Sequence, residues 1–437
     1  MSLKQTVALT STYSADLFGV VNTLFELGGL VVIHDPSGCN STYATHDEPR
    51  WYDMDSMYYI SGLTEMDAIL GNDAKLVHDV VEAAQNLHPR FIVLLQSQIP
   101  FMTGTDLTAA ADLIQADCGL PTFALPTNSM HYYLSGVSLA LALLAEQMVQ
   151  EPATGIVKAG ASAVPTASIS ANSPAASDKS ALSVNILGLA PLDFSYNGSD
   201  QSLADVLTRH GFKVISRWAM GSRLDDILRA GEADVNLVVS YGGLEAARIL
   251  QRRFGTPYVV GVPLGPKMAE LIAADLHQAA RTKQNVLTCA KRNQAKEDVS
   301  TCAKQQQAKE DVSTCAKQLQ GSSGYSPVII GESVYSTSLA LALSLAGAGQ
   351  PRVFCPLETE AELLGPRDQV VDSEALLQKL LAAEKLIIAD PLYQPICPEG
   401  ARLIRLPHEA FSGRLYRKEI PNLIQDFASF AAKITEL

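Results

Sequence analysis

Short apolar, β-branched runs alternate with longer stretches of helical pattern along most of this chain. The run Leu30–Ile33 follows one helical stretch, and the next helix and strand are predicted at Lys75–Asn86 and Phe91–Leu95. Such runs are typical of strands that are buried on both faces and therefore need no polar alternation. Strands that alternate with helices in this way predict parallel sheets with helices on both faces. The chain is therefore predicted to be an α/β protein.

The alternation occurs in three blocks, which are separated by two segments of different composition. We expect α/β domains at residues 1–150, 183–283 and 324–437, and 437 residues suit this number at roughly 100–200 residues each. Residues 151–182 are rich in Ala, Ser and Pro and nearly free of charge, which predicts a linker.

The second separating segment, residues 284–323, contains a repeat that places Cys289, Cys302 and Cys315 at thirteen-residue intervals. Two interpretations are open, a metal site and a duplicated surface insertion. If the segment is helical, about 100° per residue places successive cysteines roughly 220° apart around the axis, so they cannot converge on one ion. The insertion is the favoured interpretation.

Composition excludes several classes of function. Asp and Glu number 46 against 33 Lys and Arg, a formal charge of −13, which disfavours binding to nucleic acid or to an anionic membrane. The most apolar runs, 134–144 and 338–345, are shorter than the roughly 20 residues of a membrane span. Residues 1–10 lack the pattern of a secretion signal, so we expect a cytoplasmic protein whose seven cysteines are metal ligands or buried thiols.

The most informative motif is His-Asp-Pro-Ser-Gly-Cys at residues 34–39, directly after the strand Leu30–Ile33. Ligands of parallel α/β sheets bind at the carboxyl ends of strands. Pro36 and Gly38 predict a tight turn that presents Cys39 outward. A turn that merely contains a half-buried thiol is an equal alternative from these six residues alone.

This turn is similar to the His-Gly-Pro-x-Gly-Cys turn of the nitrogenase component 1 family, whose Cys holds an iron–sulfur cluster between two subunits. Residues 62–76 resemble the family's acidic segment with its Lys-Leu helix, and residues 239–243 and 254–259 resemble its second domain. The family includes nitrogenase, protochlorophyllide reductase, a reductase of nickel-tetrapyrrole synthesis and cofactor-assembly scaffolds. The resemblance implies three Rossmann-like domains with parallel sheets around a central cleft.

The resemblance also implies a cofactor, partners and site residues. The cofactor would be a [4Fe–4S] cluster shared with a homologous component 1 subunit, in a homo- or hetero-oligomer, with Cys39 as ligand and His34 and Gly38 beside it. Asp35 stands where the family has Gly and is either an oxygen ligand or a turn cap, the cap being favoured. Electrons would come from an ATP-dependent iron protein, since the chain has no Gly-x-x-x-x-Gly-Lys-Ser/Thr loop and hence no expected ATP site of its own.

The chain departs from the family pattern in its cysteines. Residues 57–61 and 96–100 contain none where complete cluster sites have them, and residues 238–243 lack the Cys that anchors the iron–molybdenum cofactor. One thiolate cannot hold a [4Fe–4S] cluster, so a partner subunit completes the site or the site is degenerate. Reduction of nitrogen on such a cofactor is not expected.

The preferred hypothesis is a nitrogenase-like component 1 subunit that reduces a small molecule or a tetrapyrrole. The alternatives are a non-catalytic subunit for metallocluster assembly and a small-molecule binder without a cluster. Further candidates carry weaker signals. One is the polar loop that contains His46, Asp47, Glu48, Arg50 and Trp51, which lies near the cluster or is solvated. Another is the turn at Gly188, which lacks the glycine pattern of a dinucleotide site. Cys355 and Cys397 are either buried thiols or ligands, and His408 lies either in the cleft or on a surface loop.

Overall fold

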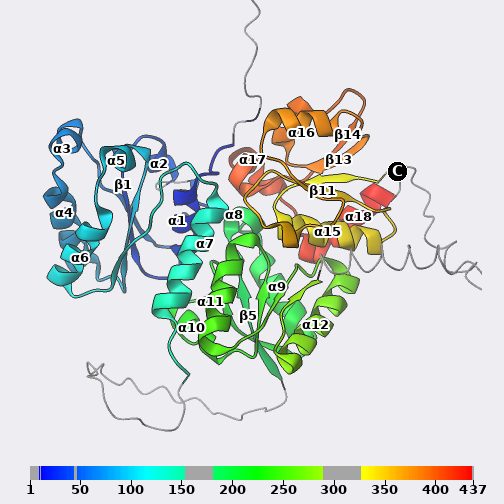
Figure 1. Ribbon diagram of the computed structural model, residues 1–437, viewed down its shortest axis with the longest axis horizontal. Helices are drawn as coiled ribbons and strands as arrows, with labels where there is room; N and C mark the ends of the chain where they lie inside the picture. The colour runs from blue at the N-terminus through cyan, green and yellow to red at the C-terminus, as the bar shows by residue number, and fades with distance from the viewer. Residues whose placement is uncertain (1–8, 10, 44–46, 153–180, 289–325, 436–437) are drawn as a thin grey trace, which may run out of the picture.

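Three α/β units, each built on one parallel sheet, make up the part of the chain that the computed structural model describes, residues 9, 11–43, 47–152, 181–288 and 326–435 (Figure 1). The predicted α/β class with parallel sheets is confirmed. The repeat with Cys289, Cys302 and Cys315 and nearly all of the predicted linker lie outside the described residues. The exact domain boundaries stay predictions.

The first sheet has the strand order β2-β1-β3-β4, and all neighbouring strands are parallel. Helices α4 and α6 cover one face, where they pack on Leu30, Val32 and Ile92, while Val31, Ile33 and Val93 face the main core. The elements are β1 (Leu30–His34), α2 (Cys39–Thr42), β2 (Met57–Ile60), α3 (Glu65–Leu70), α4 (Asp73–Leu87), β3 (Ile92–Gln96), α5 (Gln98–Thr103), α6 (Leu107–Cys118) and β4 (Thr122–Ala124).

The second sheet has the order β6-β5-β7-β8-β9 and is also parallel. Its elements are β5 (Leu182–Leu187), α8 (Pro191–Phe194), α9 (Ser199–Arg209), β6 (Phe212–Arg217), α10 (Leu224–Leu228), η3 (Ala230–Glu232), β7 (Val235–Val238), η4 (Tyr241–Gly243), α11 (Leu244–Phe254), β8 (Tyr258–Val260), α12 (Gly265–Thr282) and β9 (Val286–Leu287).

The third sheet has the order β12-β11-β10-β13-β14 and is again parallel. Its elements are β10 (Val328–Ile330), α15 (Ser333–Leu345), β11 (Arg352–Cys355), η5 (Ala361–Leu363), β12 (Gln369–Val370), α16 (Glu374–Leu381), β13 (Leu386–Ala389), η6 (Pro391–Ile396), β14 (Arg402–Arg405), α17 (Glu409–Tyr416), η7 (Arg417–Glu419) and α18 (Leu423–Thr435).

Helices from different units pack together where the three units meet (Figure 1). Helix α7 (Tyr133–Leu143), which continues into η2 (Leu144–Met148), contacts α1 (Asp16–Leu24) on one side and α11 and η4 on the other. Helix α12 contacts α15 and α18, and α17 contacts α8. One core of buried side chains therefore extends through all three units. Among the described helices, none has the length and apolar character to span a membrane.

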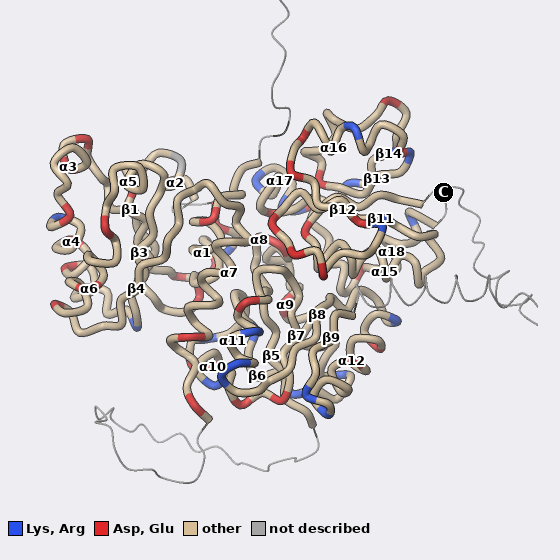
Figure 2. The backbone as a smooth tube through the Cα atoms, in the orientation of Figure 1, with Lys and Arg blue, Asp and Glu red and all other residues tan. Residues whose placement is uncertain are grey.

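Charged residues of both signs are spread over the three units. In the described part of the chain, Figure 2 shows Lys and Arg interspersed with Asp and Glu.

Two glycines allow α1 and α7 to approach each other closely. A Cβ atom on Gly19 would lie 1.9 Å from the carbonyl oxygen of Tyr133, and one on Gly136 would lie 1.7 Å from the carbonyl oxygen of Asp16. Both neighbours are backbone atoms, which cannot turn aside as a flexible side chain could. The contact therefore requires glycine at both positions.

We expect Gly136→Ala to destabilise the protein by about 1–3 kcal/mol, because the strain of separating the two backbones outweighs the roughly 1 kcal/mol that alanine gains in a helix interior. Urea unfolding of the full chain measures this change. Ser135→Ala, one residue earlier on α7, is the matched control and should stay within about 0.5 kcal/mol of the wild type. Equal stability of the two variants would contradict the packing argument.

Candidate functional site

Cys39 opens helix α2 at the carboxyl edge of the first sheet. Strand β1 is buried throughout and ends at His34, and the chain then turns through residues 35–38. Gly38 has φ 58° and ψ −130°, a conformation that favours glycine. The predicted turn after β1 is therefore present, and it leaves the sheet at the edge where β2 and β3 also end, because both strands are parallel to β1. The side chain of Cys39 is not among those described.

The other predicted residues of this turn are engaged within the chain. His34 is buried, and its Nδ1 lies 2.8 Å from Oγ of Ser61. Burial lowers the pKa of His34, and the nearby Asp73 and Asp35 partly oppose this. Asp35 Oδ2 accepts a hydrogen bond of 3.0 Å from the backbone N–H of Ser37, which is the geometry of a turn cap. Among the described residues, no three or more His, Cys, Asp or Glu side chains form a group that could hold a metal ion.

The edge around Cys39 also contains unpartnered polar atoms and exposed apolar side chains. Gln96 Oε1 and Ser97 Oγ, at the end of β3, are buried and have no hydrogen-bond partner among the described residues. Helices α3 and α5 contact each other at the same edge (Figure 1). They expose Met66, Ile69, Leu70, Ile99, Phe101 and Met102, which we call the α3–α5 patch. Large apolar side chains gathered in this way mark interaction surfaces.

The polar loop after α2 is tied into the interior. Arg50 is fully buried; its Nε and Nη2 donate to Glu48 Oε1 at 2.8 and 2.6 Å, and its Nη1 donates to Glu26 at 2.7 Å. Asp47 accepts a hydrogen bond from the Tyr13 hydroxyl. The solvated interpretation of the loop is therefore wrong for Glu48 and Arg50. Residue 46 lies outside the described residues.

The weaker candidates Cys355, Cys397 and Gly188 are packed against other parts of the chain. Cys355 is buried with Sγ 3.5 Å from the carbonyl oxygen of Leu357, and burial raises the pKa of this thiol and that of Cys397. A Cβ on Gly188 would lie 2.6 Å from Ser240 Oγ, so the turn after β5 is filled by η4 and its flank. At Gly188 the turn therefore packs closely against Ser240 and Gly243.

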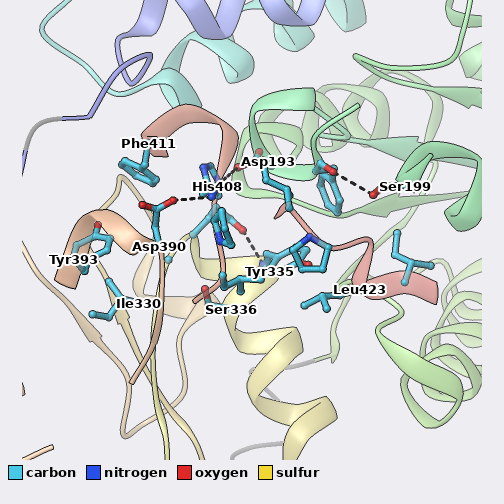
Figure 3. Close-up of a pocket in the computed structure, with 18 residues that line it drawn as sticks. Asp193, Ser199, Ile330, Tyr335, Ser336, Asp390, Tyr393, His408, Phe411 and Leu423 are labelled. Carbon is cyan, nitrogen blue, oxygen red and sulfur yellow. Dashed lines mark hydrogen bonds and ion pairs between the residues drawn. The ribbon is translucent and has the colours of Figure 1, made fainter. Parts of the chain in front are cut away.

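A pocket lies between the second and third units, and sequence reasoning did not assemble it. Its atom-free space is about 680 Å³, part of it open solvent. It is formed by α8, by the turn between β10 and α15, and by the segment around α17 (Figure 3). The lining residues are Asp193, Phe194, Ser199, Ile330, Gly331, Glu332, Tyr335, Ser336, Asp390, Tyr393, Leu406, Pro407, His408, Phe411, Ile420, Pro421, Leu423 and Ile424.

Asp193, His408 and Tyr133 meet at this pocket. The Tyr133 hydroxyl donates to Asp193 Oδ1 at 2.5 Å, and His408 Nε2 lies 3.5 Å from the same oxygen. His408 Nδ1 accepts from the backbone N–H of Ala410 at 3.3 Å, so in neutral His408 the proton is on Nε2 and faces Asp193. Figure 3 shows His408 and Asp193 side by side over the pocket. Of the two interpretations of His408, the structure supports the cleft.

Glu332 is buried at the base of the pocket and joins two units. Its carboxyl group accepts hydrogen bonds from the backbone N–H groups of Val334 and Tyr335 in α15 and from that of Tyr241 in the second unit, at 3.0, 2.7 and 2.9 Å. Burial raises the pKa of Glu332 to about 7, with repulsion from Asp193 as the next cause, while the three backbone donors oppose the rise. Near neutral pH this group can therefore hold or release a proton.

Comparison with known proteins identifies the family. The family described as nitrogenase component 1 type oxidoreductase matches residues 20–348. The chain belongs to the nitrogenase component 1 family. A light-independent protochlorophyllide reductase subunit of Rubrivivax gelatinosus is 34% identical over 97 residues, which are 22% of this chain and 18% of that protein. The nitrogenase iron-molybdenum cofactor biosynthesis protein NifE of Clostridium pasteurianum is 22% identical over 239 residues, 52% of this chain and 45% of that protein.

A solved structure of this family has the same fold. The structure titled "Nitrogenase Cp1 at pH 6.5" matches with a TM-score of 0.58 and 12% identity, over 99% of this chain and 90% of that one. At this identity the likeness shows the fold alone. The chain spans less than half of the length of these two curated relatives in the matched regions.

The raised pKa of Glu332 predicts a pH-dependent contribution to stability. The folded-state pKa lies above the ordinary value of 4.5, so protonated Glu332 stabilises the folded protein. This stabilisation is complete below about pH 4.5 and is lost as the pH rises through 7. Between pH 5 and pH 8 we expect the wild type to lose up to about 3 kcal/mol of stability relative to Glu332→Gln, which cannot ionise. Urea unfolding at several pH values measures the difference.

The exposed Glu399 provides the control, since Glu399→Gln should follow the wild-type curve at every pH. Parallel curves for the wild type and Glu332→Gln would show that Glu332 does not titrate in this range.

Proposed function

We propose that this chain is a nitrogenase-like component 1 subunit. It pairs with a homologous subunit, takes electrons from an ATP-dependent iron protein through a [4Fe–4S] cluster at the subunit interface, and reduces a small molecule or a tetrapyrrole in the pocket. The observation that carries the proposal is the position of Cys39, on a turn at the carboxyl edge of the first sheet, the edge at which α3 and α5 with their exposed apolar patch also lie.

The residues present suit a shared cluster rather than one held by this chain alone. A [4Fe–4S] cluster needs about four ligands, mainly thiolates, and transfers single electrons when bound. His34 has Ser61 as its partner and Asp35 caps the turn, so Cys39 is this chain's proposed ligand. The homologous subunit would supply the remaining ligands. Buried oxygens of Gln96 and Ser97 on one side of β1, and of Tyr58 on the other, have unused hydrogen-bonding capacity in the described part of the chain.

The α3–α5 patch supports a protein interface at this edge. Met102 is 77% exposed, Ile69 71% and Leu70 70%, values that are high for large apolar residues. Burying them against a partner would contribute roughly 25 cal/mol per Å². The same contact would keep water from Cys39 and the cluster, and a dry surrounding shell tunes the reduction potential.

The pocket has the groups that a reduction needs on the protein side. Reduction of a bound molecule by single electrons consumes protons as well. Glu332 titrates near neutral pH, and the Tyr133 hydroxyl and the His408 N–H both lie at Asp193. These residues would hold protons beside the substrate and deliver them.

A metallocluster assembly subunit is the second candidate. The observation that favours it is the similarity to NifE, which covers 52% of this chain against 22% for the protochlorophyllide reductase subunit of Rubrivivax gelatinosus. Measurement of substrate turnover distinguishes the assembly subunit from the reductase. A complex that oxidises its reduced iron protein while converting a substrate is a reductase, whereas one that binds a cluster and passes it on intact is an assembly subunit.

The cluster proposal predicts the iron content of the purified complex. Co-expressed with its partner subunit and purified without oxygen, the complex of Cys39→Ala should lose most of its iron and sulfide, because a thiolate ligand is removed. The control is Cys118→Ala, a half-buried thiol at the end of α6, which should leave the iron content unchanged. Unchanged iron in Cys39→Ala would rule the shared cluster out, and an iron-free, monomeric wild type would favour the binder without a cluster.

The interface proposal predicts the behaviour of a surface variant. Met102→Glu should weaken association with the partner subunit at least tenfold, because a charge would be buried in an apolar contact. Leu113→Glu, a 57% exposed leucine on α6, is the matched control and should associate normally. Analytical ultracentrifugation of the complex measures both, and equal association of the two variants would place the interface elsewhere.

A further inference from the structure

The pocket between the second and third units has an acceptor that nothing in the described structure satisfies. The Asp193 side chain lines the pocket and is only 1% exposed. Its Oδ1 accepts from Tyr133, but its Oδ2 is buried and has no hydrogen-bond partner among the described residues. A buried, unpaired carboxyl oxygen costs several kcal/mol, and such a cost is tolerated where a ligand supplies the missing partner.

The other acids of the pocket differ from Asp193, because their oxygens are already in use. Asp390 accepts from the backbone N–H groups of Leu392 and His408 and from the Ser412 hydroxyl. Glu332 accepts from three backbone N–H groups. Among the carboxyl oxygens of the described lining, Asp193 Oδ2 is therefore the one left without a hydrogen bond and free to accept from a bound molecule.

The lining contains no cationic partner for an anion. It includes three carboxyl groups, while Lys and Arg are absent from the described residues that form it. Neutral His408 offers no donor to an anion in the pocket. Its Nε2–H faces Asp193 Oδ1, and its Nδ1 accepts a hydrogen bond from the backbone N–H of Ala410. A ligand carboxylate or phosphate here would be repelled by Asp193 and would find no compensating charge.

The rest of the lining is largely apolar and aromatic. Phe194, Tyr393 and Phe411 form part of the wall together with Ile330, Leu423 and Ile424 (Figure 3). Such walls bind the flat or aliphatic body of a small molecule, and the polar group fixes its orientation.

We propose that this pocket selects a small, largely apolar molecule that presents an N–H donor, preferably cationic, to Asp193 Oδ2, and that it rejects anions. The inference builds on the proposed function, which places the substrate in this pocket, and it narrows the substrate class. It favours a nitrogenous small molecule over a tetrapyrrole with several carboxylates, and it disfavours an anionic metal cofactor.

Three molecules of the same shape test the proposal directly on the full chain. Benzamidine is a cation with N–H donors, benzamide is a neutral N–H donor and benzoate is an anion without a donor. By ligand-observed NMR titration we expect benzamidine to bind at least tenfold more tightly than benzoate, with benzamide between them. Benzoate binding as tightly as benzamidine would overturn the proposal, and this comparison needs no variant.

A substitution of Asp193 tests whether its carboxyl group binds benzamidine. Asp193→Asn should weaken benzamidine binding at least tenfold, because the amide replaces a negative acceptor. Asp205→Asn, at an exposed aspartate on α9, should leave the affinity unchanged. Unchanged binding in a folded Asp193→Asn protein would show that the carboxyl group is not the recognition element.

The outcome is independent of the cluster experiments. A chain that binds benzamidine as expected, but whose complex contains no iron, would contradict the proposed function and leave the ligand class standing. A complex that keeps its iron while benzoate binds best would contradict the ligand class alone.

Discussion

The buried guanidinium of Arg50 holds the first unit against the second. Besides Glu48 and Glu26, it donates to the carbonyl oxygens of Asn22 and Ala219, the latter in the second unit. Buried ion pairs contribute little net stability, yet the loss of one partner costs about 3–5 kcal/mol because a charge is left uncompensated. The Asn22 side chain continues the network, since its Oδ1 accepts from the backbone N–H of Leu192 at 3.1 Å. The loop after Cys39 is thereby connected to α8, where Asp193 lies.

Two polar groups of the pocket, Asp193 and Glu332, depend on contacts with elements outside their own units. The close approach of α1 and α7 at Gly19 and Gly136 fixes Tyr133, whose hydroxyl binds Asp193. Glu332 begins α15 in the third unit and accepts from Tyr241 in the second. A relative movement of the units would therefore change the surroundings of Asp193 and Glu332, and with them the charge balance of the pocket. The electrostatics of the site follow from the arrangement of the units rather than from any one of them.

Strands in the middle of a sheet are easier to predict from this sequence than strands at its edge. The strands β1 and β3, in the middle of the first sheet, show the continuous apolar run of a strand covered on both faces, and both were expected. The edge strands β6, β12 and β14 were missed, and each contains charged or polar residues that interrupt such a run. Helix α12 was missed although its signal was present, since Met268, Ile272, Leu276 and Ala279 recur at helical spacing on its buried face.

The two candidate sites also differ in how far the sequence predicts them. The Cys39 turn is local: six consecutive residues after one strand define it, so its position could be predicted although its ligand cannot. The pocket brings together residues 193, 332, 390 and 408, with Tyr133 bonded to Asp193, and no spacing rule connects these positions. Of the five, His408 was named as a candidate from the sequence. Three acids lie together in a lining whose described residues include no Lys or Arg, which is contrary to the pattern that stability favours. Asp193 Oδ1 serves Tyr133 and His408, whereas the buried Oδ2 serves no described residue, and a ligand in the pocket would explain that second oxygen.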